Sequence, residues 1–232
     1  MLEIISFGSS SKGNSYLLRE GGSSLLLEAG VDPRKMKVKL GDIDALLVTH
    51  EHGDHSKYVR KILERSAMSV YCTKGTADNI DAPSYRVMEM EYRNPITVKK
   101  WRIMAFEVEH DTAEPSGFLI QTPKGKKVLF ATDTYYIRYK FPGVTHMMIE
   151  CNYSLNIIDR NLAEGRIHKA LRDRVLKSHF GLDNVIEFLR SNDLSQLEEV
   201  HLLHLSDTNS HEEEFKQRIQ EVTGVPVYVA GG

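Results

Sequence analysis

The chain has 232 residues, of which 41% are hydrophobic and 27% are charged, a composition normal for a globular protein with a proper core. The formal net charge of −2 excludes nucleic-acid binding through overall charge, so any contact with phosphates needs a local basic patch.

The two cysteines, Cys72 and Cys151, lie in dissimilar sequence contexts. They indicate neither a disulfide framework nor a Cys-x-x-Cys metal site, which favours a reducing, intracellular environment. Residues 1–5 lack a basic segment followed by a long apolar one, so we expect neither a signal peptide nor a membrane span. We predict a cytoplasmic protein without a membrane partner.

Apolar runs separated by turn residues define the expected elements in chain order. Strands are predicted at 2–6, 16–19, 24–28, 42–49, 69–72, in short pieces within 85–107, and at 117–121, 128–131, 145–150, 200–203 and 225–229. Helices are predicted at 57–65, 75–80 (helix or turn), 158–177, 182–191 and 211–222, the last with Ser210 as N-cap. Helices and strands are interspersed in both halves without a repeat or linker. The sequence therefore predicts an α/β fold in one domain covering residues 1–232.

Four candidate metal ligands follow the predicted strand at 42–49: His50, His52, Asp54 and His55. Residues two apart in a strand point to the same side, so His50 and His52 can face one metal. Gly53 allows a sharp turn after which Asp54 and His55 can face a second metal. This spacing is a much stronger signal than loose clustering of histidines.

Further candidate ligands end other predicted strands. They are His110, Asp133, Glu150 and His204. Strand carboxyl ends that converge on one edge of a sheet are the usual place for a site in α/β proteins. We predict His50, His52 and His110 on one metal, Asp54, His55 and His204 on a second, and Asp133 as the bridge.

These donors are nitrogen and carboxylate atoms without a thiolate, which suits two divalent cations, Zn²⁺ or Mn²⁺, with iron as a further option. Two metals about 3.5–4 Å apart activate a water molecule and stabilise the attacking and leaving oxygens of phosphoryl transfer. The sequence therefore favours a hydrolase.

The chain resembles the metallo-β-lactamase superfamily. The matching residues occur in the expected order along the chain: Thr49-His50-Glu51-His52-Gly53-Asp54-His55, His110, Phe130-Ala131-Thr132-Asp133-Thr134 and His204-Leu205-Ser206. The resemblance implies a four-layer αββα sandwich, in which two mixed β-sheets are flanked by helices and the metals lie at one edge.

More narrowly, the chain resembles the YycJ/WalJ-like nucleases. The segments that carry this resemblance are Gly8–Ser15, His110–Gly117 and His204–Asn209. It implies a DNA exonuclease that uses two divalent cations, with hydroxide on the metals as the nucleophile. A more distant similarity to the tRNA 3′-processing (RNase Z-type) nucleases implies that Glu150 and His179 deliver a proton to the leaving oxygen. The expected catalytic residues are Asp54, Glu150 and His179.

The sequence departs from the family pattern after the third predicted strand. The family usually has Asp-x-Gly there, whereas this chain has Glu28-Ala29-Gly30. The family carboxylate supports the metal loop from behind the ligands. Glu is one methylene longer, so we expect either an adjusted backbone or weaker support, with an effect on metal occupancy.

Each group of candidate substrate-binding residues has two possible interpretations. Ser9, Ser10 and Ser11 lie in a small-residue loop that is either a surface turn or a phosphate contact. Arg172 and Arg174 belong to a basic run that is either a solvated helix face or a surface that follows the DNA backbone. Trp101 and the tyrosines at 135, 136 and 139 are either packing residues or stacking partners for bases.

We predict a two-metal phosphodiesterase that acts as a DNA nuclease, with RNA as an alternative polymer. A small-molecule hydrolase of the same superfamily, cleaving a cyclic phosphodiester, a lactone or a thioester, is the second hypothesis. A non-catalytic nucleic-acid-binding module is the third. The oligomeric state is left open.

Overall fold

The computed structural model describes residues 1–231, which form two compact units. The first unit comprises Met1–Glu107 and Thr112–Lys127, together with Gly231. The second comprises Val108–Asp111 and Val128–Ala230. The single domain expected for residues 1–232 stays a prediction, and its last residue, Gly232, lies outside the described residues.

Six strands of the first unit form a mixed sheet in the order β1-β2-β3-β4-β5-β6. They are β1 (Glu3–Gly8), β2 (Ser15–Glu20), β3 (Ser23–Leu27), β4 (Ala45–Leu47), β5 (Val70–Cys72) and β6 (Val87–Glu89). The neighbours β1, β2 and β3 are antiparallel, whereas β3 to β6 are parallel. Gly21 and Gly22 turn the hairpin between β2 and β3 with φ of 59° and 76°, values that suit glycine because it has no Cβ.

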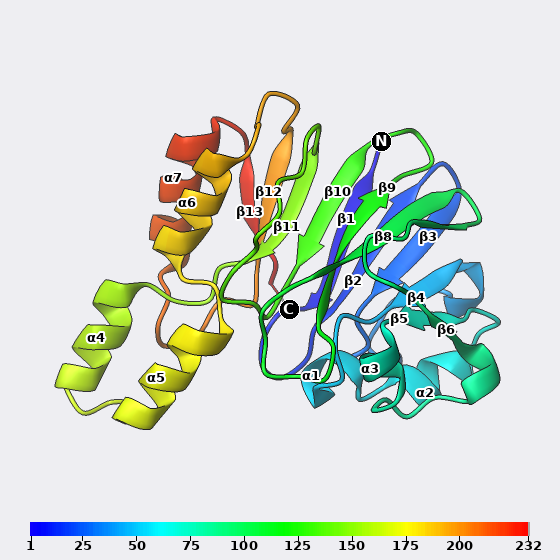
Figure 1. Cartoon of the computed structure of the whole chain (residues 1–232), viewed down its shortest axis with the longest axis horizontal. Helices are drawn as coiled ribbons and strands as arrows, with labels where there is room; N and C mark the ends of the chain where they lie inside the picture. Colours follow the sequence, from blue (N-terminus) through cyan, green and yellow to red (C-terminus); the bar gives the residue numbers. More distant parts are fainter. Residues whose placement is uncertain (232) are drawn as a thin grey trace. The chain divides into compact units, whose positions relative to one another are not determined.

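The centre of this sheet is apolar because β3 and β4 are buried along their whole length. Leu26 and Leu46 pack in one cluster with Val59 and Ile62 from helix α2 (Val59–Leu63). The unit also has α1 (Gly53–Ser56), α3 (Lys74–Ala77) and two 3₁₀ turns, Leu40–Asp42 and Ser84–Arg86. Helices α2 and α3 lie next to β4, β5 and β6 (Figure 1).

Replacing Leu26 by alanine is expected to lower the free energy of unfolding by about 2–5 kcal/mol, because the cavity left in a fully buried cluster collapses only partly. Urea unfolding followed by circular dichroism measures the change. Leu171→Ala is the control, since Leu171 is 40% exposed and its truncation should cost no more than about 0.5 kcal/mol. Equal losses in the two variants would contradict the assignment of Leu26 to the core.

Three antiparallel strands complete the first unit: β7 (Ile96–Val98), β8 (Trp101–Glu107) and β9 (Ser116–Gln121). Trp101 is fully buried, and its Nε1 donates to Asp44 Oδ2 at 3.2 Å. This burial makes Trp101 a packing residue rather than a stacking partner for a base. The backbone N–H of Ser116 donates to the carbonyl of Thr49 at 3.0 Å, which attaches β9 to the segment that carries His50.

The second unit contains four parallel strands in the order β13-β12-β11-β10. They are β10 (Lys127–Ala131), β11 (His146–Glu150), β12 (Glu199–Leu203) and β13 (Val227–Val229). In the register, Ala131 pairs with Ile149 and Glu150 pairs with Leu203. The carboxyl ends of β10, β11 and β12 therefore lie at one edge, as the sequence predicts for the candidate ligands that follow them.

Four helices accompany these strands: α4 (Leu155–Ala163), α5 (Lys169–Ser178), α6 (Leu182–Ser191) and α7 (Glu212–Thr223). Figure 1 shows α6 and α7 side by side next to β12 and β13, whereas α4 and α5 form a separate pair. Ile158 of α4 and Val175 of α5 are buried together with Tyr153. Within residues 1–231, no helix has the length and apolar character needed to cross a membrane.

Two predicted helices differ from those observed. The helix expected at 158–177 is interrupted, because α4 ends at Ala163 and Gly165 adopts a left-handed φ of 70°, a conformation that commonly ends helices. The prediction of Ser210 as the N-cap of the last helix is wrong. His211 is the N-cap, and its Nδ1 accepts from the backbone of Glu214 at 3.2 Å. The hydroxyl of Ser210 instead donates to the carbonyl of Ser206 at 2.7 Å.

Candidate metal centre

The first unit supplies one set of candidate ligands. The rings of His50 and His52 have centroids 4.9 Å apart, and one ligand atom of each lies within 4.8 Å of the other. The ring centroids of His55 and His50 are 4.2 Å apart, and Nε2 of His55 lies 3.4 Å from Asp54 Oδ2. The structure thus brings all four predicted residues of this motif together.

The local geometry that does so differs from the predicted one. Strand β4 ends at Leu47, so strand alternation does not place His50 and His52. His52 is instead the N-cap of α1, and the first turn of this helix presents Asp54 and His55. Gly53 has no left-handed φ, and a Cβ built on it would meet open space. The sharp glycine turn predicted at Gly53 is therefore wrong.

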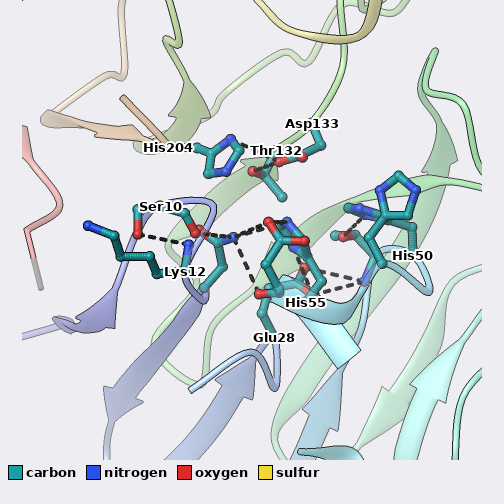
Figure 2. Close-up of polar contacts among 12 residues, drawn as sticks. Ser10, Lys12, Glu28, His50, His55, Thr132, Asp133 and His204 are labelled. Atoms are coloured by element: carbon teal, nitrogen blue, oxygen red, sulfur yellow. Dashed lines mark hydrogen bonds and ion pairs between the residues drawn. The ribbon is translucent and has the colours of Figure 1, made fainter. Parts of the chain in front are cut away.

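Glu28 contacts the segment that carries the candidate ligands of the first unit. Its carboxylate is fully buried and accepts from the backbone N–H of Thr49 at 3.3 Å, and its Oε2 lies 3.5 Å from His55 Nδ1 (Figure 2). Burial raises the pKa of the Glu28 carboxyl. Glu28 has a left-handed φ of 66°, which is costly for a residue with a side chain. The two outcomes expected for this departure, an adjusted backbone or weaker support, stay predictions.

Two residues that the sequence did not single out also hold this loop. Asn14 donates its backbone N–H to the carbonyl of Asp54 at 2.7 Å, and its Nδ2 lies 3.0 Å from His55 Nε2. A Cβ on Gly30 would lie 1.7 Å from the Asp54 carbonyl oxygen, so this position accepts only glycine. The glycine of the Glu28-Ala29-Gly30 segment was the available signal for this close approach.

The second unit supplies another set of candidate ligands. Asp133 and His204 follow β10 and β12 with left-handed φ angles of 46° and 53°. His204 Nδ1 lies 3.4 Å from Asp133 Oδ1, and His110 Nε2 lies 3.9 Å from Asp133 Oδ2. Thr132 donates its hydroxyl to Asp133 Oδ1 at 2.8 Å. The three predicted ligands of this unit are thus grouped around one carboxylate.

Glu150 joins the candidate site residues of the second unit through hydrogen bonds. Its fully buried carboxylate accepts four hydrogen bonds, which come from His179 Nδ1 (2.6 Å), His204 Nδ1 (3.1 Å), Thr134 N (3.0 Å) and Phe180 N (3.1 Å). One ligand atom from each of Asp133, Glu150, His179 and His204 lies within 4.8 Å of the others. The predicted pair of Glu150 and His179 is therefore in direct contact.

The charges in this group reinforce one another. Burial alone would raise the pKa of the Glu150 carboxyl, but the adjacent His179 holds that pKa below its usual value. Burial would likewise lower the pKa of His179, but the Glu150 carboxylate holds it above its usual value. Burial does lower the pKa of His110, which favours the neutral imidazole that binds metals.

The orientation of the three histidines suits metal or substrate contacts. Nδ1 of His110 donates to the carbonyl of Ser178 at 3.1 Å, and Nδ1 of His179 and of His204 donates to Glu150. A hydrogen bond at Nδ1 fixes the ring and makes Nε2 the ligand atom, as in carboxylate–histidine–metal arrangements. Imidazole nitrogens with carboxylate oxygens form a donor set that suits a divalent cation such as Zn²⁺ or Mn²⁺.

The predicted substrate contacts have varied surroundings. Ser9 Oγ and the Tyr16 hydroxyl are hydrogen bonded at 2.7 Å, and Ser10 Oγ accepts from the backbone of Lys12 at 3.2 Å (Figure 2), whereas Ser11 is exposed. Arg172 is held by Asp159 at 2.7 Å and by Asp173 at 3.3 Å. Arg174 is exposed on α5 and has no ion-pair partner in the described part of the chain.

Comparison with known proteins places these residues in a family context. The family described as the β-lactamase superfamily domain matches residues 23–192. Exodeoxyribonuclease WalJ of Streptococcus pneumoniae is 26% identical over 227 residues, which covers 88% of this chain and 82% of the relative. Exodeoxyribonuclease YycJ of Bacillus anthracis is 23% identical over 232 residues, covering 92% of this chain and 86% of the relative.

A solved structure agrees with the family match. The metallo-β-lactamase fold protein YhfI from Bacillus subtilis has a TM-score of 0.78 at 15% identity, covering 100% of this chain and 96% of that chain. The predicted fold, two mixed β-sheets flanked by helices, is confirmed by this likeness.

Proposed function

Because the chain belongs to the metallo-β-lactamase superfamily of metal-dependent hydrolases, we propose that it is a phosphodiesterase that degrades DNA as an exonuclease. The proposal is supported by two relatives named exodeoxyribonucleases, each of which is aligned over more than four fifths of its own length. RNA is the alternative polymer substrate.

We further propose two divalent cations, Zn²⁺ or Mn²⁺, as cofactors. We assign the ligands by their order in the sequence and by the family: His50, His52 and His110 for one cation, Asp54, His55 and His204 for the other, and Asp133 as the bridge. When bound, such cations activate water and neutralise the charge that develops on the phosphate oxygens. The nitrogen and carboxylate donors within each unit suit this chemistry.

The observation that carries the proposal is the contact of Glu150 with both His179 and His204. One carboxylate oxygen of Glu150 accepts from Nδ1 of both rings, at 2.6 Å and 3.1 Å. His204 is thereby oriented as a ligand, and His179 is oriented beside it with its own Nε2 directed away from Glu150. A proton on His179 Nε2 can pass to the leaving oxygen, while Glu150 stabilises the charged imidazole.

A nuclease assay with metal titration tests this proposal. The metal-depleted protein should degrade linear DNA after addition of Mn²⁺ or Zn²⁺, and labelled ends should be released before internal cuts appear. Activity on a small phosphodiester, a lactone or a thioester, but on no polymer, would favour the small-molecule hydrolase instead. A protein that binds DNA but retains no metal and cleaves nothing would favour the non-catalytic module.

Replacing Glu28 by glutamine is expected to weaken metal binding by about 10- to 100-fold, the usual effect of removing a carboxylate that orients a ligand. The uncharged amide no longer favours the tautomer of His55 that donates from Nδ1. Competition with a fluorescent zinc chelator measures the affinity. Glu64→Gln, at an exposed glutamate of the same unit, is the control. Unchanged affinity in the Glu28 variant would show that this contact does not tune the ligand.

We also propose that the exposed Arg174 contacts DNA phosphates, with Arg172 positioned less favourably because two aspartates already bind it. Arg174→Glu should raise the KM for DNA by about 3- to 10-fold at low salt, and it should reduce the salt dependence of binding by about one counterion. Arg65→Glu, at an exposed arginine of the first unit, is the control. An unchanged salt dependence would exclude this contact. Ser9, Ser10 and Ser11 remain proposed phosphate contacts, for which Ser11→Ala in the same assay is the test.

A further inference from the structure

A groove in the second unit lies beside the residues that surround Glu150. It has a volume of about 400 Å³ and runs between residues 135–140 and the segment from Phe180 to Ser191 that contains α6. Phe180 and Phe188 line it from the buried side, with ring centroids 6.2 Å apart and an angle of 57° between the rings. The volume is within the range of small-ligand pockets.

The outer wall of the groove presents two adjacent aromatic side chains to solvent. Tyr135 is 40% exposed and Tyr136 is 54% exposed, although exposed aromatic surface is unfavourable in water. Their backbone is nevertheless fixed. Tyr135 N donates to the carbonyl of Glu109 at 3.2 Å, and the Thr134 hydroxyl donates to the carbonyl of Tyr136 at 2.9 Å. The backbone that carries the two rings is therefore fixed before any ligand binds.

The polar groups of the groove suit a nucleotide. Lys140 is exposed and has no ion-pair partner among residues 1–231, so it can bind a phosphate, whereas Arg138 is already paired with Glu109. The amide of Asn184 can both donate to and accept from the edge of a base, and the carboxylate of Glu187 can accept from an exocyclic amine. The faces of Tyr135 and Tyr136 offer stacking surfaces that every base can use.

Both walls of the groove start at residues that bind Glu150. The backbone of Thr134, directly before Tyr135, donates to Glu150 Oε2 at 3.0 Å. The backbone of Phe180, directly after His179, donates to the same oxygen at 3.1 Å. Two residues that line the groove, Tyr135 and Phe180, thus lie within one residue of groups that contact Glu150, and Phe180 directly follows the proposed proton donor His179.

We propose that this groove binds a nucleobase of single-stranded DNA next to the phosphodiester bond that is cut, with the base stacked on Tyr136. The inference rests on the proposed function, since it names the part of the substrate that the same site would recognise. It also gives a reason for strand-end specificity, because a base stacked here must first leave the duplex.

Binding of fluorescein-labelled oligodeoxythymidine of about ten nucleotides, followed by anisotropy in excess chelator, tests the inference without catalysis. Tyr136→Ala should raise the dissociation constant by about 5- to 100-fold, the effect of losing one stacked base, and Tyr136→Phe should retain parental affinity. Tyr85→Ala is the control, because Tyr85 is an exposed tyrosine (77%) of the first unit. Circular dichroism checks that each variant is folded.

Three results would overturn the inference: no oligonucleotide binding by the parent, parental affinity in Tyr136→Ala, or equal losses in Tyr136→Ala and Tyr136→Phe. Hydrolysis of the same DNA by the parent with Mn²⁺ is measured separately. Binding that depends on Tyr136 without hydrolysis under any metal would refute the proposed function and leave the groove assignment standing. Hydrolysis by the parent together with unchanged binding in Tyr136→Ala would refute the groove assignment and leave the proposed function standing.

Discussion

Replacing Asp54 by alanine is expected to abolish metal-dependent DNA hydrolysis, with a loss in kcat/KM on the order of 10³-fold or more. Asp54 Oδ2 lies 3.4 Å from His55 Nε2 at the start of α1, and the proposed function assigns both side chains to one cation. Removal of this proposed charged ligand should lower the affinity for that cation and leave the other proposed cation alone in the site. Hydrolysis of end-labelled linear DNA and the metal content of the purified protein are the two measurements.

Asp42→Ala is the matched control for this experiment, because Asp42 is an exposed carboxylate on a 3₁₀ turn of the same unit. It should retain the metal content and the hydrolysis rate of the parent. An Asp54→Ala protein that contains the parental amount of metal and hydrolyses DNA at the parental rate would remove Asp54 from the catalytic centre. Loss of metal without loss of rate would instead show that the second cation is dispensable.

The second large effect is expected at His179. His179→Ala should lower kcat for DNA by about 10²- to 10⁴-fold, because the leaving alkoxide loses the proton donor that we propose for it. A phosphodiester with a p-nitrophenolate leaving group needs no protonation, so the same variant should lose much less activity on bis(p-nitrophenyl) phosphate. The ratio of the two losses separates proton donation from a structural role.

His168→Ala is the control, since His168 is an exposed histidine directly before α5 in the same unit. Both substrates should be hydrolysed at parental rates by this variant. Equal losses on the two substrates in His179→Ala would contradict proton donation, and they would indicate that His179 acts as a metal ligand or holds Glu150 in place. Metal content of the His179 variant distinguishes these two outcomes.

The grouping of the candidate ligands within each unit was predictable because it depends on the order of motifs and on strand ends. The parallel register brings the residues after β10, β11 and β12 to one edge whatever their side chains are. The means of grouping was less predictable. His52 is placed by a helix N-terminus rather than by a strand, and short elements such as α1 leave no periodicity in the sequence.

Other features depend on contacts between residues far apart in the chain. The approach of Glu28 to His55, and of Asn14 to Asp54, cannot be read from local pattern, because each joins segments brought together only by the sheet. Gly165 was a local signal for the break between α4 and α5. The sequence has a helical pattern on both sides of this glycine, so the pattern alone predicts one continuous helix. The cap at His211 replaced Ser210 because the serine hydroxyl has a different partner.

The left-handed backbones at Glu28, Asp133 and His204 bear on how this protein would respond to laboratory evolution. Each costs on the order of 1–3 kcal/mol for a residue with a side chain. Glycine or asparagine would relieve that cost at each position. Selection for thermal stability alone should therefore enrich these two residues at positions 28, 133 and 204. Such selection would remove the carboxylate and imidazole groups at these positions. Variants selected for stability alone should therefore lose function first through substitutions at these three positions.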